Sequence, residues 1–226
     1  MEMKIEKINY FPDPEKLAEK YSIEKDDYLY EKIVLACEEI SRIGKPVVCF
    51  KKSTVDSAGE DYVIVDGIKF SGKFIAEMLC GCKEVYPFIA SCGPELDCWG
   101  RNTDDIMLNY CLDDLRQASI KPVLDVLRKR LEEDFGACKL SVVNPGSIPN
   151  WPISEQKKLF ELMGPVYERI GVRLDDTMLM YPLKSVSGIY FEHKDGYCNC
   201  RICKRNNCPS RREKFNEEEM IKMLDT

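Results

Sequence analysis

The sequence predicts an α+β fold with a mostly antiparallel sheet, because its expected strands and helices intermingle without a regular βαβ rhythm. Several short apolar runs are bounded by turn residues, and Asp66-Gly67 within DYVIVDGIKF is a hairpin signal. Other stretches place apolar residues three and four positions apart, which indicates helices. A chain of 226 residues with 44% apolar residues is long enough for one substantial domain or two small ones.

A helix is predicted over residues 26–43. Its apolar residues fall at helical spacing, at Leu29, Ile33, Ala36 and Ile40. Gly44 and Pro46 are expected to end it, since neither continues a helix readily. Ahead of it, residues 1–22 are expected to form a leading arm, with a strand in MKIEKINYF.

Short strands are predicted to follow this helix. KPVVCFKKSTV is expected to be one strand, and DYVIVDGIKF two strands around the hairpin. The stretch KEVYPFIASCG is an apolar strand closed by Gly93 and Pro94. Between the hairpin and this strand, SGKFIAEMLCGC predicts a short helix opened by Ser71.

The second half of the chain begins with a helical zone over residues 103–135, kinked near Pro122. The loop NPGSIPNWP follows, and then a helix in ISEQKKLFELMGPVYERI that stops at Gly171. VRLDDTMLMYPLKSVSGIYFEH alternates as strands do, and NEEEMIKMLDT predicts a short amphipathic helix. We divide the chain into residues 1–58, an N-terminal arm and helix packed on the main domain, and residues 59–226, the main domain.

Composition points to a cytoplasmic protein. No run approaches the ~20 apolar residues that span a bilayer, and the first residues are too charged for the apolar core of a signal peptide. The net charge of −6 argues against general nucleic-acid binding, which relies on a basic face. We therefore expect neither a membrane nor a nucleic acid as a partner.

Four of the twelve cysteines form a cluster with the spacing C-x-C-x2-C-x4-C. They are Cys198, Cys200, Cys203 and Cys208. Thiolates bind soft or borderline metals, and four ligands in one short loop are tight for a zinc tetrahedron but suit an iron–sulfur cluster. Iron–sulfur, zinc and no metal all remain open. The scattered Cys37, Cys49, Cys111 and Cys138 are expected to be packing residues.

Residues 170–197 resemble the activation (reactivation) domain of cobalamin-dependent methionine synthase, as found in stand-alone bacterial relatives. The matching motifs are Ile170-Gly171, Asp176-Thr177, Met180-Tyr181-Pro182, Ser185-Val186-Ser187-Gly188, Tyr190-Phe191 and His193-Lys194-Asp195. The specific part of the likeness covers roughly residues 140–215, and a weaker part reaches back to about residue 60. The resemblance implies a twisted antiparallel sheet flanked by helices.

The resemblance also implies partners and ligands. Such domains bind S-adenosylmethionine and present its methyl group to cobalamin that has been oxidised to Co(II), while a flavoprotein supplies an electron. The implied partner is therefore a corrinoid-binding methyltransferase or methionine synthase module, with a flavoprotein or ferredoxin as donor. The cofactor-binding candidates that the resemblance places on this chain are Gly146, Ser147, Lys184, Ser185, Val186, Ser187, Gly188, Tyr190 and His193. It assigns no catalytic residue.

The adenosylmethionine loop departs from the family's pattern. Gly146 fits the family's glycine, but Val142 stands where the arginine is found and Ser147 where the tyrosine is found. A guanidinium supplies five fixed donors to a carboxylate-bearing ligand, so its loss argues against S-adenosylmethionine binding in the usual way.

The function we expect is assistance in the reductive reactivation or methylation of cobalamin in a corrinoid-dependent methyltransferase. In this reading the chain is part of the methionine synthase (methyltransferase) system, and the cysteine loop holds an iron–sulfur cluster that donates the electron. The alternative is a non-enzymatic protein that binds a corrinoid, S-adenosylmethionine or a partner domain. Its cysteine loop would then hold a structural zinc or no metal.

Overall fold

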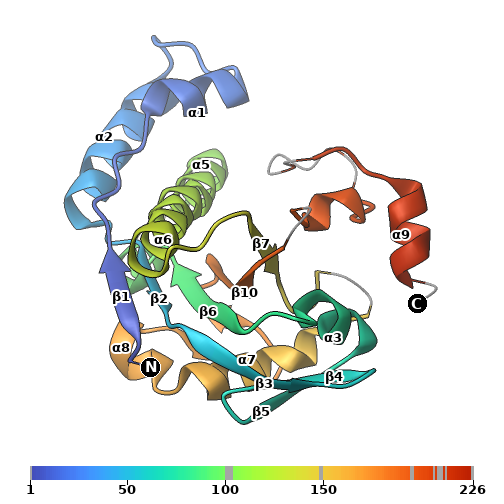
Figure 1. Cartoon of the computed structure of the whole chain (residues 1–226). Coiled ribbons are helices and arrows are strands. Elements are labelled where there is room, and N and C mark those ends of the chain that lie inside the picture. Colours follow the sequence, from blue (N-terminus) through green and yellow to red (C-terminus); the bar gives the residue numbers. More distant parts are fainter. Residues whose placement is uncertain are drawn as a thin grey trace.

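The molecule is built around a curled antiparallel sheet flanked by helices, which confirms the predicted α+β class (Figure 1). The computed structural model describes residues 2–99, 104–147, 150–193, 196–205, 207, 211 and 213–224. Among these residues, no helix is both long and apolar enough to cross a membrane.

Strand β6 (Glu84–Ser91) is the central strand of the eight-stranded sheet. Along one side it pairs with β10 (Ser185–Glu192), which in turn pairs with β7 (Leu140–Val143). Along its other side it pairs first with β2 (Val47–Phe50) and then with β3 (Ser53–Ala58). All of these pairs are antiparallel.

The remaining strands of the sheet extend it at both ends. β1 (Lys4–Lys7) lies outside β2. β4 (Tyr62–Val65) and β5 (Ile68–Ser71) continue from β3 through the predicted hairpin, where Asp66 and Gly67 both have positive φ, as a tight hairpin turn requires. Because β1, β2 and β3 share a sheet with later strands, residues 1–58 contribute directly to the main sheet; the boundary at residue 58 stays a prediction.

Side chains on the central strands alternate between the two faces of the sheet, as the period of two requires. Phe50, Phe88 and Tyr190 share one apolar cluster with helix α6 (Ile120–Phe135). On the opposite face, Cys49 and Ile89 pack against helices α7 (Gln156–Met163) and α8 (Val166–Ile170). Both faces are covered, so the central strands read as nearly continuous apolar runs.

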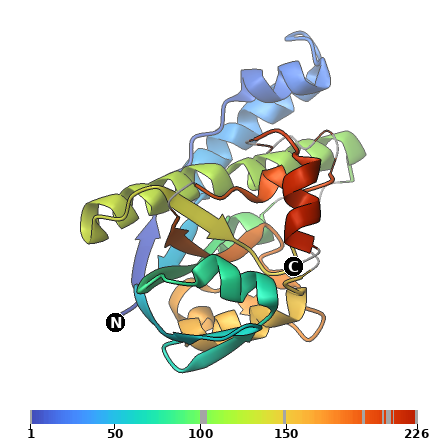
Figure 2. The ribbon, with the colours of Figure 1, turned by 45° about the vertical axis from the view of Figure 1, so that its right-hand side comes forward.

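The two long predicted helical stretches are confirmed. α2 (Tyr28–Ile43) begins after Asp27, whose carboxylate accepts a hydrogen bond from the Leu29 amide at 2.8 Å. α5 (Ile106–Ala118) and α6 together form a rod that crosses the sheet (Figure 2). The rod is interrupted at the buried Ser119, three residues before the predicted kink at Pro122, and the Ser119 hydroxyl donates to the Arg116 carbonyl at 2.7 Å.

Two predicted helix boundaries are wrong. α3 (Lys73–Leu79) begins after Gly72, because Ser71 is still the last residue of β5, opposite Tyr62 of β4. The single helix expected to end at Gly171 is divided into the 3-10 turn η1 (Ile153–Glu155), α7 and α8. Gly164, with φ of +79°, and Pro165 break it.

Several short elements were not predicted. They are α1 (Pro14–Tyr21), α4 (Pro94–Cys98), β7 and the 3-10 turn η2 (Asn199–Arg201). β8 (Arg173–Leu174) and β9 (Met180–Tyr181) form a small separate sheet, and α9 (Glu217–Leu224) confirms the predicted last helix. Of the scattered cysteines, Cys37, Cys49 and Cys111 are buried as expected, whereas the prediction for Cys138 is wrong because its side chain is exposed.

Candidate functional site

The SVSG segment forms the first half of β10 and pairs with β6, while the second half of β10 pairs with both β6 and β7. Ser187 is buried, and its carbonyl accepts a hydrogen bond from the side-chain amide of Asn144 at 2.8 Å. Asn144 directly follows β7 and begins the loop that contains Gly146 and Ser147. The strand and the loop, both predicted to bind a cofactor, are therefore joined by a side chain that the sequence did not single out.

Gly188 is required by close packing. A Cβ atom at this position would lie 2.5 Å from the Asn144 amide nitrogen, 2.7 Å from the Val143 carbonyl oxygen and 2.9 Å from the Phe88 ring. The Val143 oxygen belongs to the backbone of the neighbouring strand, so it cannot move aside without disturbing the sheet. The absence of a side chain at Gly188 thus lets Asn144 reach Ser187.

The C-terminal segment meets the same loop through Asn199. The Asn199 amide nitrogen donates to the Ser147 hydroxyl at 3.0 Å and lies 3.4 Å from the Asn144 amide oxygen. The Ser147 hydroxyl in turn donates to the Asn144 carbonyl at 2.6 Å. We call these four residues, Asn144, Ser147, Ser187 and Asn199, the asparagine junction.

Gly146 shapes the loop within this junction. Its φ of +77° lies in the left-handed region that favours glycine. Its amide donates to the Trp151 carbonyl at 2.8 Å, and a Cβ atom here would lie 2.9 Å from Ile153. The predicted glycine is therefore needed for the turn itself; a role in ligand binding stays a prediction.

Four buried polar atoms on and around this loop have no hydrogen-bond partner among the described residues. They are Trp151 Nε1, Gln156 Nε2, Tyr197 Oη and Asn199 Oδ1. An unpaired buried polar group costs about 1–3 kcal/mol, so such groups gather where a ligand or water completes them. Burial, with the neighbouring Cys198 as a smaller cause, raises the pKa of the Tyr197 phenol. The phenol therefore stays protonated and can donate.

The other predicted cofactor-binding residues are spread along β10. The Lys184 ammonium pairs with Asp113 of α5 at 2.8 Å, and the Ser185 hydroxyl donates to the Pro182 carbonyl at 2.7 Å. Val186 packs against two apolar clusters, one that includes residues of α2 and α5 and one that includes residues of α6. Tyr190 is buried against Phe88, with ring centroids 5.0 Å apart.

His193 is half-buried just after β10, with its ring edge-on to Phe191. It lies at the opposite end of the strand from Ser185, so the predicted residues of β10 do not converge on one point. Their binding roles stay predictions.

The cysteine loop follows β10 and runs beside β7. Cys198 is buried and forms a parallel bridge with Val142, while Cys200 and Cys203 are half-buried. Cys208 lies outside the described residues. Within the described part of the chain, no three His, Cys, Asp or Glu side chains are grouped so that they could hold a metal ion. The three described thiols therefore do not form a ligand set by themselves.

Arg211 organises the cysteine loop instead. Its guanidinium donates to the carbonyl oxygens of Cys200 at 2.8 Å, Cys203 at 3.0 Å, Arg205 at 2.6 Å and Glu213 at 3.4 Å. Arg201, which follows Cys200, is ion-paired with Glu213. The planar fork of an arginine suits this bridging of several acceptors. The sequence showed Arg211 only as one of several cations near the cysteines, which carried no signal of this role.

Comparison with known proteins confirms the predicted resemblance. Residues 145–214 match the family model described as "Vitamin B12 dependent methionine synthase, activation domain". The fold is similar to that in a crystal structure of the MetH reactivation domain bound to AdoHcy. That likeness has a TM-score of 0.55 and 16% identity, and it covers 86% of this chain and 80% of the other. No curated protein sequence gives a significant match.

Proposed function

We propose that this chain assists the reductive methylation or reactivation of cobalamin that is carried by a corrinoid-binding methyltransferase or methionine synthase module. One observation carries the proposal: the segment that matches the activation-domain model contains the Gly146 loop, β10 and the cysteine loop. The Gly146 loop, which is distant in the sequence from the other two parts, meets them at the asparagine junction. The implied electron donor is a flavoprotein or ferredoxin.

The ligand that we propose for the junction is S-adenosylmethionine, which supplies a methyl group when bound. The junction offers amide and hydroxyl groups from Asn144, Ser147 and Asn199, and the unpaired N–H groups of Trp151 and Gln156 lie in the same loop and the helix after it. These groups fit a ligand rich in hydroxyl, amino and carboxylate groups.

No arginine is available at the family's position to hold the ligand's carboxylate. Val142 is buried there in the cluster that contains Tyr190. Among the described cations of neighbouring elements, Lys158 pairs with Glu155 at 2.8 Å and Arg201 is paired with Glu213. Neutral donors bind a carboxylate less strongly than a bidentate guanidinium does. We therefore propose weaker binding than in a domain that has the arginine.

Calorimetric titration with S-adenosylmethionine and S-adenosylhomocysteine tests this proposal. We expect both to bind, and Asn199→Ala to weaken binding about fivefold, since a lost hydrogen bond costs about 1 kcal/mol and 1.4 kcal/mol is a factor of ten. Asn9→Ala is the control, because Asn9 is exposed and contacts Lys45, away from the junction. The absence of binding heat with wild-type protein would contradict the adenosyl part of the proposal.

The finer hypothesis is that Cys198, Cys200, Cys203 and Cys208 hold an iron–sulfur cluster that serves as the electron donor. The described thiols do not by themselves support this arrangement, and no electron-transfer step follows from their positions. The order that Arg211 gives to the loop instead favours a second candidate function. This is a non-enzymatic binding protein whose cysteine loop is structural, with zinc or no metal.

Anaerobic purification followed by iron, sulfide and zinc analysis distinguishes these two readings. Iron and acid-labile sulfide in similar amounts, with broad absorption towards the violet, are the result expected of the redox reading. A colourless protein, with or without stoichiometric zinc, would leave only the structural reading. The calorimetric result is independent of this one, so the adenosyl ligand and the metal are tested separately.

A further inference from the structure

A pair of thiols, apart from the cysteine loop, lies at the C-terminal end of α3 in the turn Leu79–Cys82, whereas Gly72 at the other end of α3 lies beside Asn150 and Trp151. The Cys82 amide donates to the Leu79 carbonyl at 3.1 Å. Cys80 has φ −59° and ψ 124°, and Gly81 has φ +80°. These are the dihedral angles of a type II turn, in which glycine is favoured at the third position. The turn thus places a cysteine on either side of a glycine.

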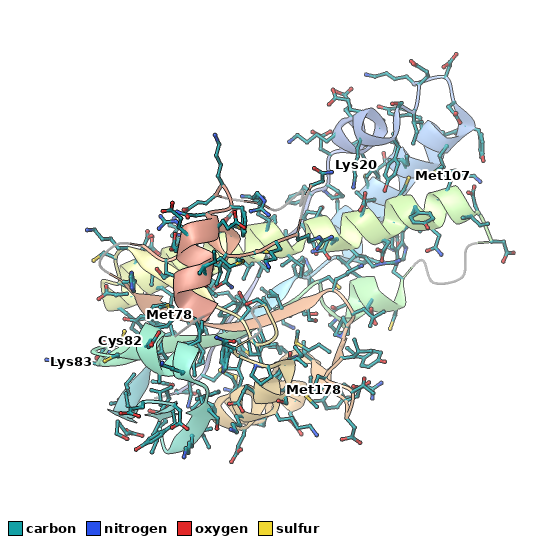
Figure 3. All side chains as sticks on the ribbon, turned by 90° about the vertical axis from the view of Figure 1, so that its right-hand side faces the viewer. Lys20, Met78, Cys82, Lys83, Met107 and Met178 are labelled. Carbon is teal, nitrogen blue, oxygen red and sulfur yellow. The ribbon has the colours of Figure 1, made fainter. Side chains whose placement is uncertain are left out.

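The turn is firmly anchored on one side and open on the other. Met78 and Leu79, immediately before it, are buried in the core of the molecule. Cys80 is exposed and Cys82 is half-buried. A Cβ atom added at Gly81 would meet nothing within 4 Å, so a reagent can approach the tip of the turn. Figure 3 shows Cys82 and Lys83 at the edge of the molecule beside α3, with the Lys83 side chain directed into solvent.

The spacing of the two cysteines along the chain is compatible with a disulfide between them. Residues two positions apart can be separated by at most about 7 Å between Cα atoms, and disulfides span about 4.4–6.8 Å. Burial, and then the charge of Cys80, raise the pKa of Cys82. The Cys82 sulfur also lies 3.7 Å from the Glu192 carbonyl at the end of β10.

We propose that Cys80 and Cys82 form a dithiol site that undergoes thiol–disulfide exchange with a low-molecular-weight disulfide such as oxidised glutathione. The exposed Cys80 thiolate attacks the glutathione disulfide, forms a mixed disulfide and releases one glutathione thiolate. Cys82 then loses its proton and attacks the Cys80 sulfur, so the mixed disulfide breaks and the second glutathione leaves. The two cysteines lose two electrons and two protons, and oxidised glutathione becomes two glutathione thiols.

Tryptic mapping isolates this pair from the other cysteines. Cleavage after Lys73 and Lys83 gives the peptide of residues 74–83, in which Cys80 and Cys82 are the only cysteines. Residues 131–139 form a matched control peptide, with the single exposed Cys138. The Cys138 amide donates to the Glu192 carboxylate at 2.6 Å. Each peptide therefore contains a cysteine that contacts Glu192 at the end of β10.

The whole protein is incubated in glutathione buffers of increasing oxidation, blocked with N-ethylmaleimide and digested. We expect the 74–83 peptide to lose both maleimide adducts without gaining glutathione, while the Cys138 peptide gains one glutathione. The Cys82→Ser variant should retain a glutathione on Cys80. This mixed disulfide should form faster than the one on Cys82 in the Cys80→Ser variant. A wild-type 74–83 peptide that carries glutathione, or that keeps both maleimide groups while Cys138 is modified, would overturn the proposal.

Discussion

Replacing Gly188 with alanine is expected to lower the free energy of unfolding by about 1–3 kcal/mol, the usual cost of forcing an extra methyl group into a packed core. The new Cβ would meet three groups closer than 3.0 Å, and one of them is the Val143 backbone carbonyl. Urea unfolding followed by circular dichroism measures the change. The same substitution should also weaken adenosyl ligand binding, because Asn144 would be pushed away from Ser187.

A double variant identifies the group that causes the clash. Asn144→Ala removes one of the three close contacts but leaves the Val143 carbonyl in place. We therefore expect Gly188→Ala combined with Asn144→Ala to be at least as unstable as Gly188→Ala alone. Stability of the single variant within about 0.5 kcal/mol of wild type, the range of ordinary surface substitutions, would show that the two strands can separate to accept the methyl group.

Replacing Arg211 with lysine is expected to loosen the cysteine loop without unfolding the protein. A lysine keeps the charge but presents its donors from one point, so it cannot bridge the carbonyls of Cys200, Cys203, Arg205 and Glu213 together. The rate at which a maleimide modifies Cys200 and Cys203 should rise about tenfold, which corresponds to about 1.4 kcal/mol in the opening of the loop.

Arg205→Lys is the matched control for this experiment. Arg205 lies in the same loop, but its side chain is exposed and only its carbonyl contacts Arg211. Modification rates in this variant should equal those of wild type. Equal rates in Arg211→Lys would mean that the order of the loop comes from other contacts. The ion pair of Arg201 with Glu213 and the buried Ile202 would then be the ones to test.

The sequence predicted those elements whose signal is local. Helix α2 carries its own apolar stripe and its own cap at Asp27, and the Asp66-Gly67 hairpin carries its turn residues. β7 was missed because four residues between a long helix and a loop give too short a pattern. The start of α3 was misplaced because Ser71 resembles an N-cap, whereas it lies opposite Tyr62 of β4 as the last residue of β5.

In the candidate site, too, the local motifs were predicted and the contacts between distant segments were not. Motif likeness predicted the Gly146 loop and the SVSG strand, and spacing singled out the cysteines; all three lie in the segment that the family model matches. It could not predict that Asn144 and Asn199, 55 residues apart, would meet. Nor could it show that the SVSG glycine is fixed by Val143 and Phe88. Such contacts depend on how distant strands are aligned, which no local pattern encodes.

The course of the C-terminal segment has a consequence for solubility. β7 is bonded to β10 on one side only, and its LSVV sequence would make its other edge a ready template for pairing with a second chain. The segment covers that edge, through the bridge from Cys198 to Val142 and the bond from the Tyr197 amide to the Ser141 hydroxyl at 2.7 Å. The segment that contains the cysteine loop therefore also protects the sheet from edge-to-edge aggregation.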